Sequence, residues 1–160
     1  MNKPFFQLNF VKKIMRIIER ISFQTQDIDL VIKEKNKIRL WIVNAIKNEG
    51  KKTGDITYIF CTDNYLLQMN QQYLQHDDYT DVITFDYTEG DRASGDIFIS
   101  YERILDNSNI LDTKLEDELH RVMIHGIMHL CGYKDKQTDD RKQMTEKENQ
   151  YLNLLHTQKN

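Results

Sequence analysis

The 160-residue chain is poor in proline, glycine and cysteine, with one, six and two residues respectively. So few chain breakers, together with 10% aromatic residues, exclude a collagen-like or low-complexity chain. The two cysteines, Cys61 and Cys131, lie far apart and form no C-x-x-C pair, which argues against a disulfide framework and a cysteine zinc site. We therefore expect a globular protein of a reducing compartment, the cytoplasm.

Long apolar runs are also missing. The longest nearly uncharged ones, such as 56–61 and 122–131, are shorter than the roughly 18 residues that cross a bilayer, so no membrane partner is expected. In residues 1–20 the apolar side chains precede the basic ones, the reverse of a secretory signal. We predict a poorly ordered N-terminal extension over 1–20, with a start at Met15 left open, and a single domain over 21–160.

The net charge of −3 hides an asymmetry between the two parts of the chain. Residues 1–52 carry 12 basic and 5 acidic side chains, whereas residues 53–160 carry 10 basic and 20 acidic ones. A concentrated basic face can bind phosphates even on an acidic protein, and a solvated helix surface is the alternative. Charge alone leaves both open.

Hydrophobic periodicity predicts alternating strands and helices without internal repeats. Strands are predicted at 21–24, 55–61, 81–85 and 96–100, and helices at 33–49, from 63 onward, at 113–131 and at 138–155. The helix at 113–131 has the most continuous apolar stripe, and Gly132 follows where a C-terminal cap belongs. We expect an α+β fold with a small central sheet of about four strands packed against helices.

The chemistry-bearing residues gather at the end of this core helix. His125 and His129 are four residues apart, so they share one helix face and can direct two imidazole nitrogens at one point. Catalytic zinc takes three protein ligands, and a positive φ at Gly132 would return the chain and bring Asp135 toward the pair. The prediction is a site for one Zn²⁺, held by His125, His129 and Asp135.

Two histidines at this spacing are, on their own, more often ordinary helix-face residues than ligands. The glycine and the aspartate at matching offsets favour the metal site, and the arrangement matches that of metzincin peptidases. Those enzymes carry a glutamate after the first histidine, where this chain has Gly126. A peptidase would therefore lack its general base.

The same residues resemble a bacterial family, the YbeY-type endoribonucleases or rRNA maturation factors. The match covers H-G-x-x-H-L-x-G-Y at 125–133, Asn70, Tyr73, Asp77, the segment 79–85 and Gly-Asp-Ile at 95–97. The resemblance implies an α+β domain with zinc held by three side chains. It also implies cleavage of single-stranded RNA during 16S rRNA maturation, with the small ribosomal subunit or its assembly intermediates as partners.

Two positions depart from the family pattern. The family's third histidine is Asp135 here, preceded by Lys134, and Leu74 replaces an arginine suited to clamping phosphate. Positive charge would then have to come from elsewhere; the candidates are His76 and the basic residues of the first predicted helix, Lys33, Lys35, Lys37 and Arg39.

The function predicted from the sequence is a zinc-dependent, single-strand-specific endoribonuclease of ribosome biogenesis, using a metal-activated water. A zinc-containing ribosome-assembly factor that does not cut RNA is the alternative, and a zinc peptidase is a disfavoured third. Glu118 is expected to be an exposed first-turn carboxylate, with a role beside His125 as the alternative. Aromatic residues that can stack on bases are expected in the core; they are Tyr73, Tyr79, Phe85 and Tyr87.

Overall fold

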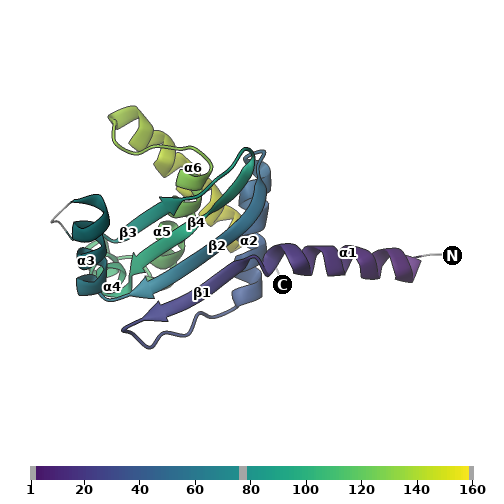
Figure 1. Ribbon diagram of the computed structural model, residues 1–160, viewed down its shortest axis with the longest axis horizontal. Coiled ribbons are helices and arrows are strands. Elements are labelled where there is room, and N and C mark those ends of the chain that lie inside the picture. Colours follow the sequence, from purple (N-terminus) through teal and green to yellow (C-terminus); the bar gives the residue numbers. More distant parts are fainter. Residues whose placement is uncertain (1–2, 76–78, 159–160) are drawn as a thin grey trace.

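The computed structural model describes residues 3–75 and 79–158 (Figure 1). The described helices are α1 (Lys3–Ile18), α2 (Lys35–Asn48), α3 (Asp63–Leu74), α4 (Tyr101–Ile110), α5 (Leu115–Leu130) and α6 (Thr138–Thr157). The strands are β1 (Ile21–Gln26), β2 (Lys52–Cys61), β3 (Val82–Asp86) and β4 (Arg92–Ser100). The predicted α+β fold with four strands is confirmed.

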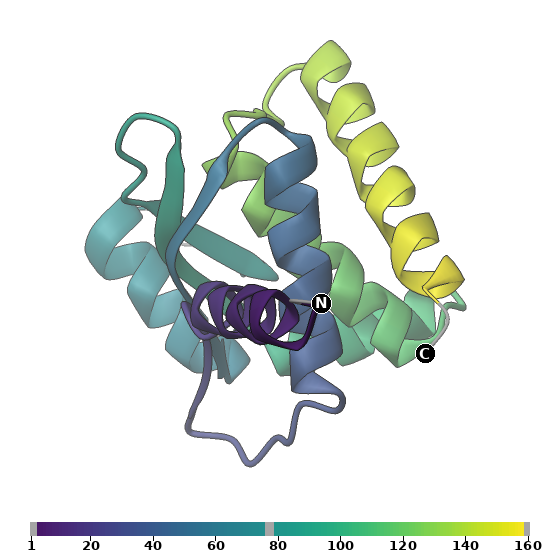
Figure 2. The same ribbon diagram turned by 90° about the vertical axis from the view of Figure 1, so that its right-hand side faces the viewer.

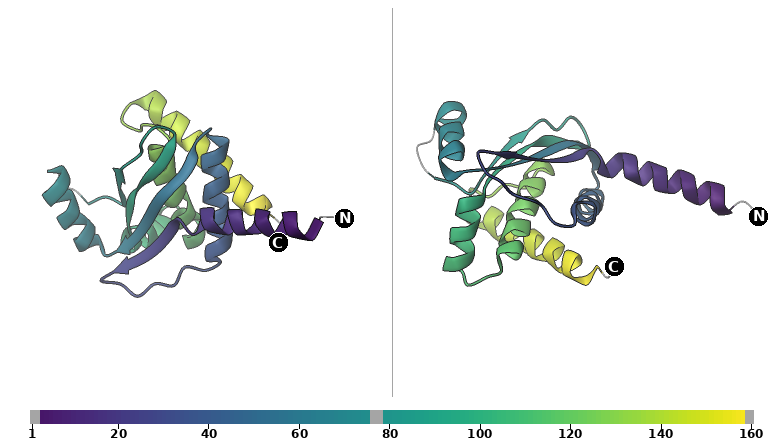
Figure 3. Two further views of the ribbon diagram at one scale, coloured as in Figure 1. Left: turned by 45° about the vertical axis from the view of Figure 1, so that its right-hand side comes forward. Right: turned by 90° about the horizontal axis from the view of Figure 1, so that it is seen from below.

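The four strands form one mixed sheet in the order β1-β2-β4-β3. Strands β1, β2 and β4 are parallel, and β3 is antiparallel to β4 with Ile83 opposite Phe98. Helices α2, α5 and α6 cover one face of the sheet, whereas α3 lies at its far end (Figure 3). The main core therefore lies between the sheet and these three helices.

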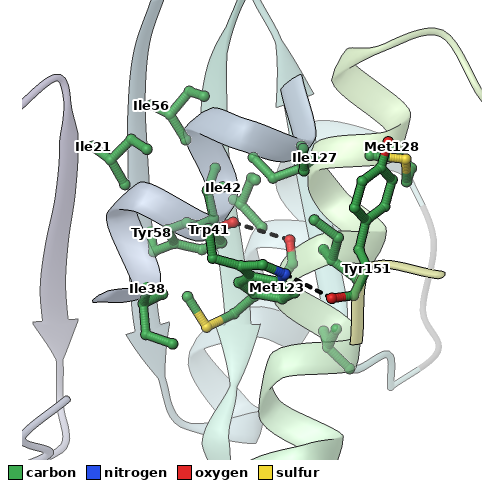
Figure 4. Close-up of a cluster of buried hydrophobic side chains, with 14 of the residues drawn as sticks. Ile21, Ile38, Trp41, Ile42, Ile56, Tyr58, Met123, Ile127, Met128 and Tyr151 are labelled. Atoms are coloured by element: carbon green, nitrogen blue, oxygen red, sulfur yellow. Dashed lines mark hydrogen bonds between the residues drawn. The ribbon is translucent and has the colours of Figure 1, made fainter. Parts of the chain in front are cut away.

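Two buried hydrogen bonds hold the layers of this core together (Figure 4). The Trp41 indole on α2 donates to the backbone carbonyl of Tyr151 on α6 at 2.7 Å. The Tyr58 hydroxyl on β2 donates to the carbonyl of Met123 on α5 at 3.0 Å. Because both donors are fully enclosed in apolar surroundings, each would be costly to leave unpaired. The first bond thus holds α2 against α6, and the second holds α5 against the sheet.

Gly126 lets α5 approach β4 closely. A Cβ atom built at this position would lie only 2.9 Å from two side-chain carbons of Ile97, closer than such atoms pack. The glycine after the first histidine of the pair is therefore required by packing. No helix within the described residues is both long and apolar enough to cross a membrane.

Two helices and the start of one strand differ from the secondary structure predicted from the sequence or add to it. Residues 1–20, set apart above as an extension, contain α1, which projects beyond the sheet and is seen end-on in Figure 2. Helix α4 was not predicted, because it starts directly after β4 without a chain breaker; the Ser100 hydroxyl caps it by accepting from the Arg103 amide at 3.1 Å. Strand β4 also begins at Arg92, four residues earlier than predicted.

Candidate metal centre

The end of α5 turns the chain back as the sequence predicted. Gly132 has a φ of 102°, and the amide of Tyr133 donates to the carbonyl of Met128 at 3.0 Å. Only glycine adopts this backbone conformation without strain. The segment that follows runs back beside the helix, and Asp135 comes to lie next to both histidines.

The three predicted ligands meet at one point. The Nε2 atoms of His125 and His129 are 3.0 Å apart, and Oδ2 of Asp135 lies 3.2 Å from the first and 3.3 Å from the second. Ligand atoms on a tetrahedral zinc, at about 2.0 to 2.1 Å from the metal, are roughly 3.3 Å from one another. The triangle therefore has the size that one divalent cation requires.

The other ring nitrogen of each histidine is held by an acceptor. Nδ1 of His125 lies 2.8 Å from Oε2 of Glu148, and Nδ1 of His129 lies 2.9 Å from the carbonyl oxygen of Tyr133. A carboxylate and a carbonyl only accept hydrogen bonds, so both Nδ1 atoms donate. The two Nε2 lone pairs and the Asp135 carboxylate are then three acceptors that face one another. Either a proton or a metal ion must lie among them to offset their mutual repulsion.

Glu148, on α6, was not identified in the sequence analysis. Its carboxylate is nearly buried and also accepts a hydrogen bond from Arg121 at 3.1 Å. Burial of the His125 ring opposes its protonation, but the hydrogen bond and charge of Glu148, with the charges of Asp135 and Asp81, outweigh burial and raise the pKa of His125. Glu148 therefore orients the first histidine and makes it more basic.

Two further acidic side chains lie near this cluster. Burial raises the pKa of Asp81, which lines the same groove, although the charge of His125 opposes the shift. Glu118 is only 6% exposed, so the expectation of an exposed first-turn carboxylate is wrong. Its burial, together with the charges of Asp81 and Glu148, raises its pKa against the opposing charge of Arg121. The glutamate that is hydrogen-bonded to His125 is Glu148.

The turn that holds His129 is anchored to α2 and α6 through Glu49. The Tyr133 hydroxyl donates to Oε2 of Glu49 at 2.7 Å, while Lys147 at 2.9 Å and the Tyr151 hydroxyl donate to Oε1. Burial would raise the pKa of Glu49, but these three donors lower it overall. A charged, nearly buried carboxylate thus fixes the residue whose carbonyl orients His129.

The candidate centre opens into a groove of about 910 Å³ between β3, the end of α3 and the turn 132–136. Its described cations are Lys134 and Lys136. Leu74 lines the groove and is 43% exposed.

The aromatic residues expected in the core are mostly exposed. Tyr79 lines the groove and is 53% exposed, and Tyr73 and Tyr87 are similarly exposed, so the expectation is wrong for these three tyrosines. Phe85 is partly buried and packs against a smaller core cluster.

The basic residues in α2 and just before it lie elsewhere. Lys33 is 3.9 Å from Glu116, at the other end of α5 and roughly 14 Å along the helix from His125 at 1.5 Å per residue. Arg39 donates to the carbonyl of Ile21 at 2.8 Å. These side chains do not supply the positive charge at the candidate centre, and His76 lies outside the described residues.

Cys131, next to the end of α5, packs against the core, and burial raises the pKa of its thiol to about 12. The thiol therefore stays protonated at neutral pH and is unsuited to bind zinc.

Comparison with known proteins identifies the family of the chain. The sequence profile described as Endoribonuclease YbeY matches residues 20–156. Proteins of that name are 50% identical in Flavobacterium psychrophilum, covering 88% of this chain and 99% of the relative, and 50% identical in Parabacteroides distasonis, covering 84% and 95%. A solution structure from Thermotoga maritima shares the fold with a TM-score of 0.59 at 24% identity, covering 84% of this chain and 88% of that one. The chain belongs to the YbeY endoribonuclease family.

Proposed function

We propose that this protein is a zinc-dependent endoribonuclease that cleaves single-stranded RNA, with His125, His129 and Asp135 as the ligands of one Zn²⁺. The observation that carries the proposal is the triangle of three acceptor atoms at 3.0 to 3.3 Å, which opens into a groove. The endoribonuclease names of the family profile and of close relatives support the same reaction class.

The donor set fits zinc rather than magnesium or calcium. Two imidazole nitrogens and one carboxylate are ligands that suit zinc, whereas the harder cations prefer oxygen ligands alone. A zinc ion held here would supply a Lewis acid and an acidified water to the reaction. The negative charge of Asp135, in place of a neutral histidine, would make such a metal a weaker Lewis acid.

The protein's own residues position the substrate. Lys134 and Lys136 are on the turn beside Asp135, where their ammonium groups can pair with phosphates on either side of the scissile bond. The exposed ring of Tyr79 offers a stacking surface for an unpaired base, and the Arg103 guanidinium lies over the same ring at 5.4 Å. Stacking of this kind requires splayed bases, which favours single strands over duplexes.

The resemblance described above extends the proposal to ribosomal RNA. The substrate is then precursor 16S rRNA within the small ribosomal subunit or its assembly intermediates, in the cytoplasm. An assembly factor that keeps zinc without cutting RNA is the second candidate, and Leu74 is the observation that favours it, since no arginine reaches the groove from this position.

Metal analysis joined to a cleavage assay tests the proposal. The purified protein should contain about one zinc ion per chain and should cut a single-stranded RNA in a reaction that a chelator stops and added zinc restores. A duplex of the same sequence should resist cleavage. Bound zinc without cleavage of single-stranded RNA would favour the assembly factor, and absence of bound metal would overturn both candidates.

A further inference from the structure

A second cleft lies away from the metal groove and is strongly basic. It has a volume of about 710 Å³ and lies between α1, α2 and the first residues of β2 and β4. Of the twelve described residues that line it, eight are lysine or arginine and none is acidic. The eight are Lys12, Lys13, Arg16, Arg20, Lys47, Lys51, Lys52 and Arg92. We call this feature the basic cleft.

Most of this charge is not neutralised within the protein. Arg20 lies 3.2 Å from Asp55, and Lys52 lies 3.5 Å from Asp91. Among the described residues, the other six cations of the basic cleft form no ion pair within 4.0 Å. Like charges gathered around one concave surface repel one another, so the cleft gains stability when an anion enters.

The basic cleft is built from parts far apart in the chain. Helix α1 supplies Lys12, Lys13 and Arg16, and it is held against the body by the buried side chain of Ile18. The family profile begins at residue 20, so this wall of the cleft lies outside the segment that the family shares. The opposite wall comes from the end of α2 and the turn that follows, with Lys47 and Lys51.

No described residue lines both the basic cleft and the metal groove. Lys47 and Lys51 flank Glu49 in the sequence, and Glu49 accepts the hydrogen bond from Tyr133, which lines the groove. An RNA that contacts both places must therefore be longer than one that is held at the metal groove alone.

We propose that the basic cleft binds the phosphate backbone of a second RNA segment, separate along the chain from the segment at the metal groove. The choice of RNA rests on the function proposed above. A planar bilayer does not reach cations that line a concave surface, whereas a single phosphodiester strand can follow a cleft and contact several of them. The cleft would then position a long or folded substrate without taking part in the cleavage step.

Two sets of substitutions test the two walls. One is Lys12→Ala with Lys13→Ala and Arg16→Ala, and the other is Lys47→Ala with Lys51→Ala. The matched control removes three exposed lysines elsewhere, Lys33→Ala with Lys35→Ala and Lys142→Ala. Fluorescence anisotropy of the purified proteins measures binding of an RNA of about 24 nucleotides, and cleavage is followed with that RNA and with one of about 6 nucleotides.

Each wall variant should bind the long RNA roughly tenfold more weakly than the control. The slope of log K against log salt should become less steep by about 2 in the variant that loses three cations and by about 1.4 in the variant that loses two. Cleavage of the short RNA should be unchanged in both. Long-RNA binding and salt slope equal to those of the control would overturn the proposal, even if cleavage persists. Loss of binding to phosphatidylglycerol vesicles, with RNA binding intact, would also overturn it in favour of a lipid surface. If neither the parent nor any variant cleaves RNA, the anisotropy measurement still decides whether the basic cleft binds RNA.

Discussion

Nδ1 of His125 on α5 lies 2.8 Å from the carboxylate of Glu148 on α6, so a residue 23 positions further along the chain determines which ring nitrogen faces Asp135. The Glu148 carboxylate can only accept a hydrogen bond, so the hydrogen between the two groups is on Nδ1 of His125. The packing of α6 on α5 is therefore part of the candidate metal centre and does more than complete the core.

The first prediction concerns metal retention. His125→Ala or His129→Ala leaves two of three ligands, so the zinc content after dialysis should fall from about one per chain to near zero. The control is His156→Ala, since His156 pairs with Asp117 at 2.9 Å near the far end of α6. Elemental analysis of the four proteins gives the answer. Equal zinc in all of them would refute the ligand assignment.

The second prediction concerns the third ligand. Asp135→His restores a nitrogen donor of the type found in the family pattern and should keep the metal, whereas Asp135→Ala should lose much of it. Asp139→Ala, which removes an exposed carboxylate in the first turn of α6, serves as the comparison. A metal-bound structure in which another side chain completes the triangle would show that Asp135 was wrongly chosen.

The third prediction concerns Glu148 as a positioning residue. Glu148→Gln removes the charge that orients His125, so zinc affinity should drop by about 10- to 100-fold. Competition with a chromophoric chelator measures this affinity. Glu146→Gln lies on the exposed side of the same helix and should leave it unchanged. If both variants bind zinc like the parent, Glu148 has a structural role alone, and unfolding curves would then register its loss.

The fourth prediction concerns stability and pH at Glu49. Its pKa is lowered below the ordinary 4.5 in the folded protein, so its charge stabilises the fold above about pH 4.5 and this contribution is lost as pH falls through the folded value. Glu49→Gln should reduce the free energy of unfolding by about 1 to 3 kcal/mol at neutral pH. Denaturant curves at several pH values should converge with those of the parent below pH 4.5. A difference that does not change with pH would contradict the role of the charge.

The fifth prediction separates enzyme from assembly factor. Leu74→Arg places a guanidinium at the groove, where it can stabilise charge on the phosphate, and should raise cleavage of single-stranded RNA by about tenfold or more. Leu111→Arg adds the same charge at an exposed position after α4 and should have no effect. If the parent cuts no RNA and Leu74→Arg restores nothing while ribosome assembly still depends on the protein, the assembly factor is the better description.

The local parts of the candidate centre were predictable from the sequence, because their signal is short in range. The helical spacing of the two histidines, the cap at Gly132 and the returning Asp135 all lie within 11 residues. The central sheet followed from β-branched runs between polar turns. The structure places the two histidines, Gly132, Asp135 and the four-stranded sheet as these patterns predicted.

Other parts depend on contacts between distant segments and leave no pattern to read. Glu49 and Tyr133 are 84 positions apart in the chain, and no sequence pattern around either residue predicts their hydrogen bond. The exposure of Tyr79 and the burial of Glu118 were both misjudged, because residue type gives only an average tendency and tertiary packing decides the individual case.

The close approach of Gly126 to Ile97 restricts which substitutions can occur beside the candidate metal centre during evolution. Any side chain at 126 must displace a branched residue in the middle of β4, so the two positions cannot vary independently. We expect that a descendant gaining a side chain there would first need a smaller residue at 97. The reactions that this scaffold can acquire are therefore restricted by a core contact on the helix face next to the one that bears the two histidines.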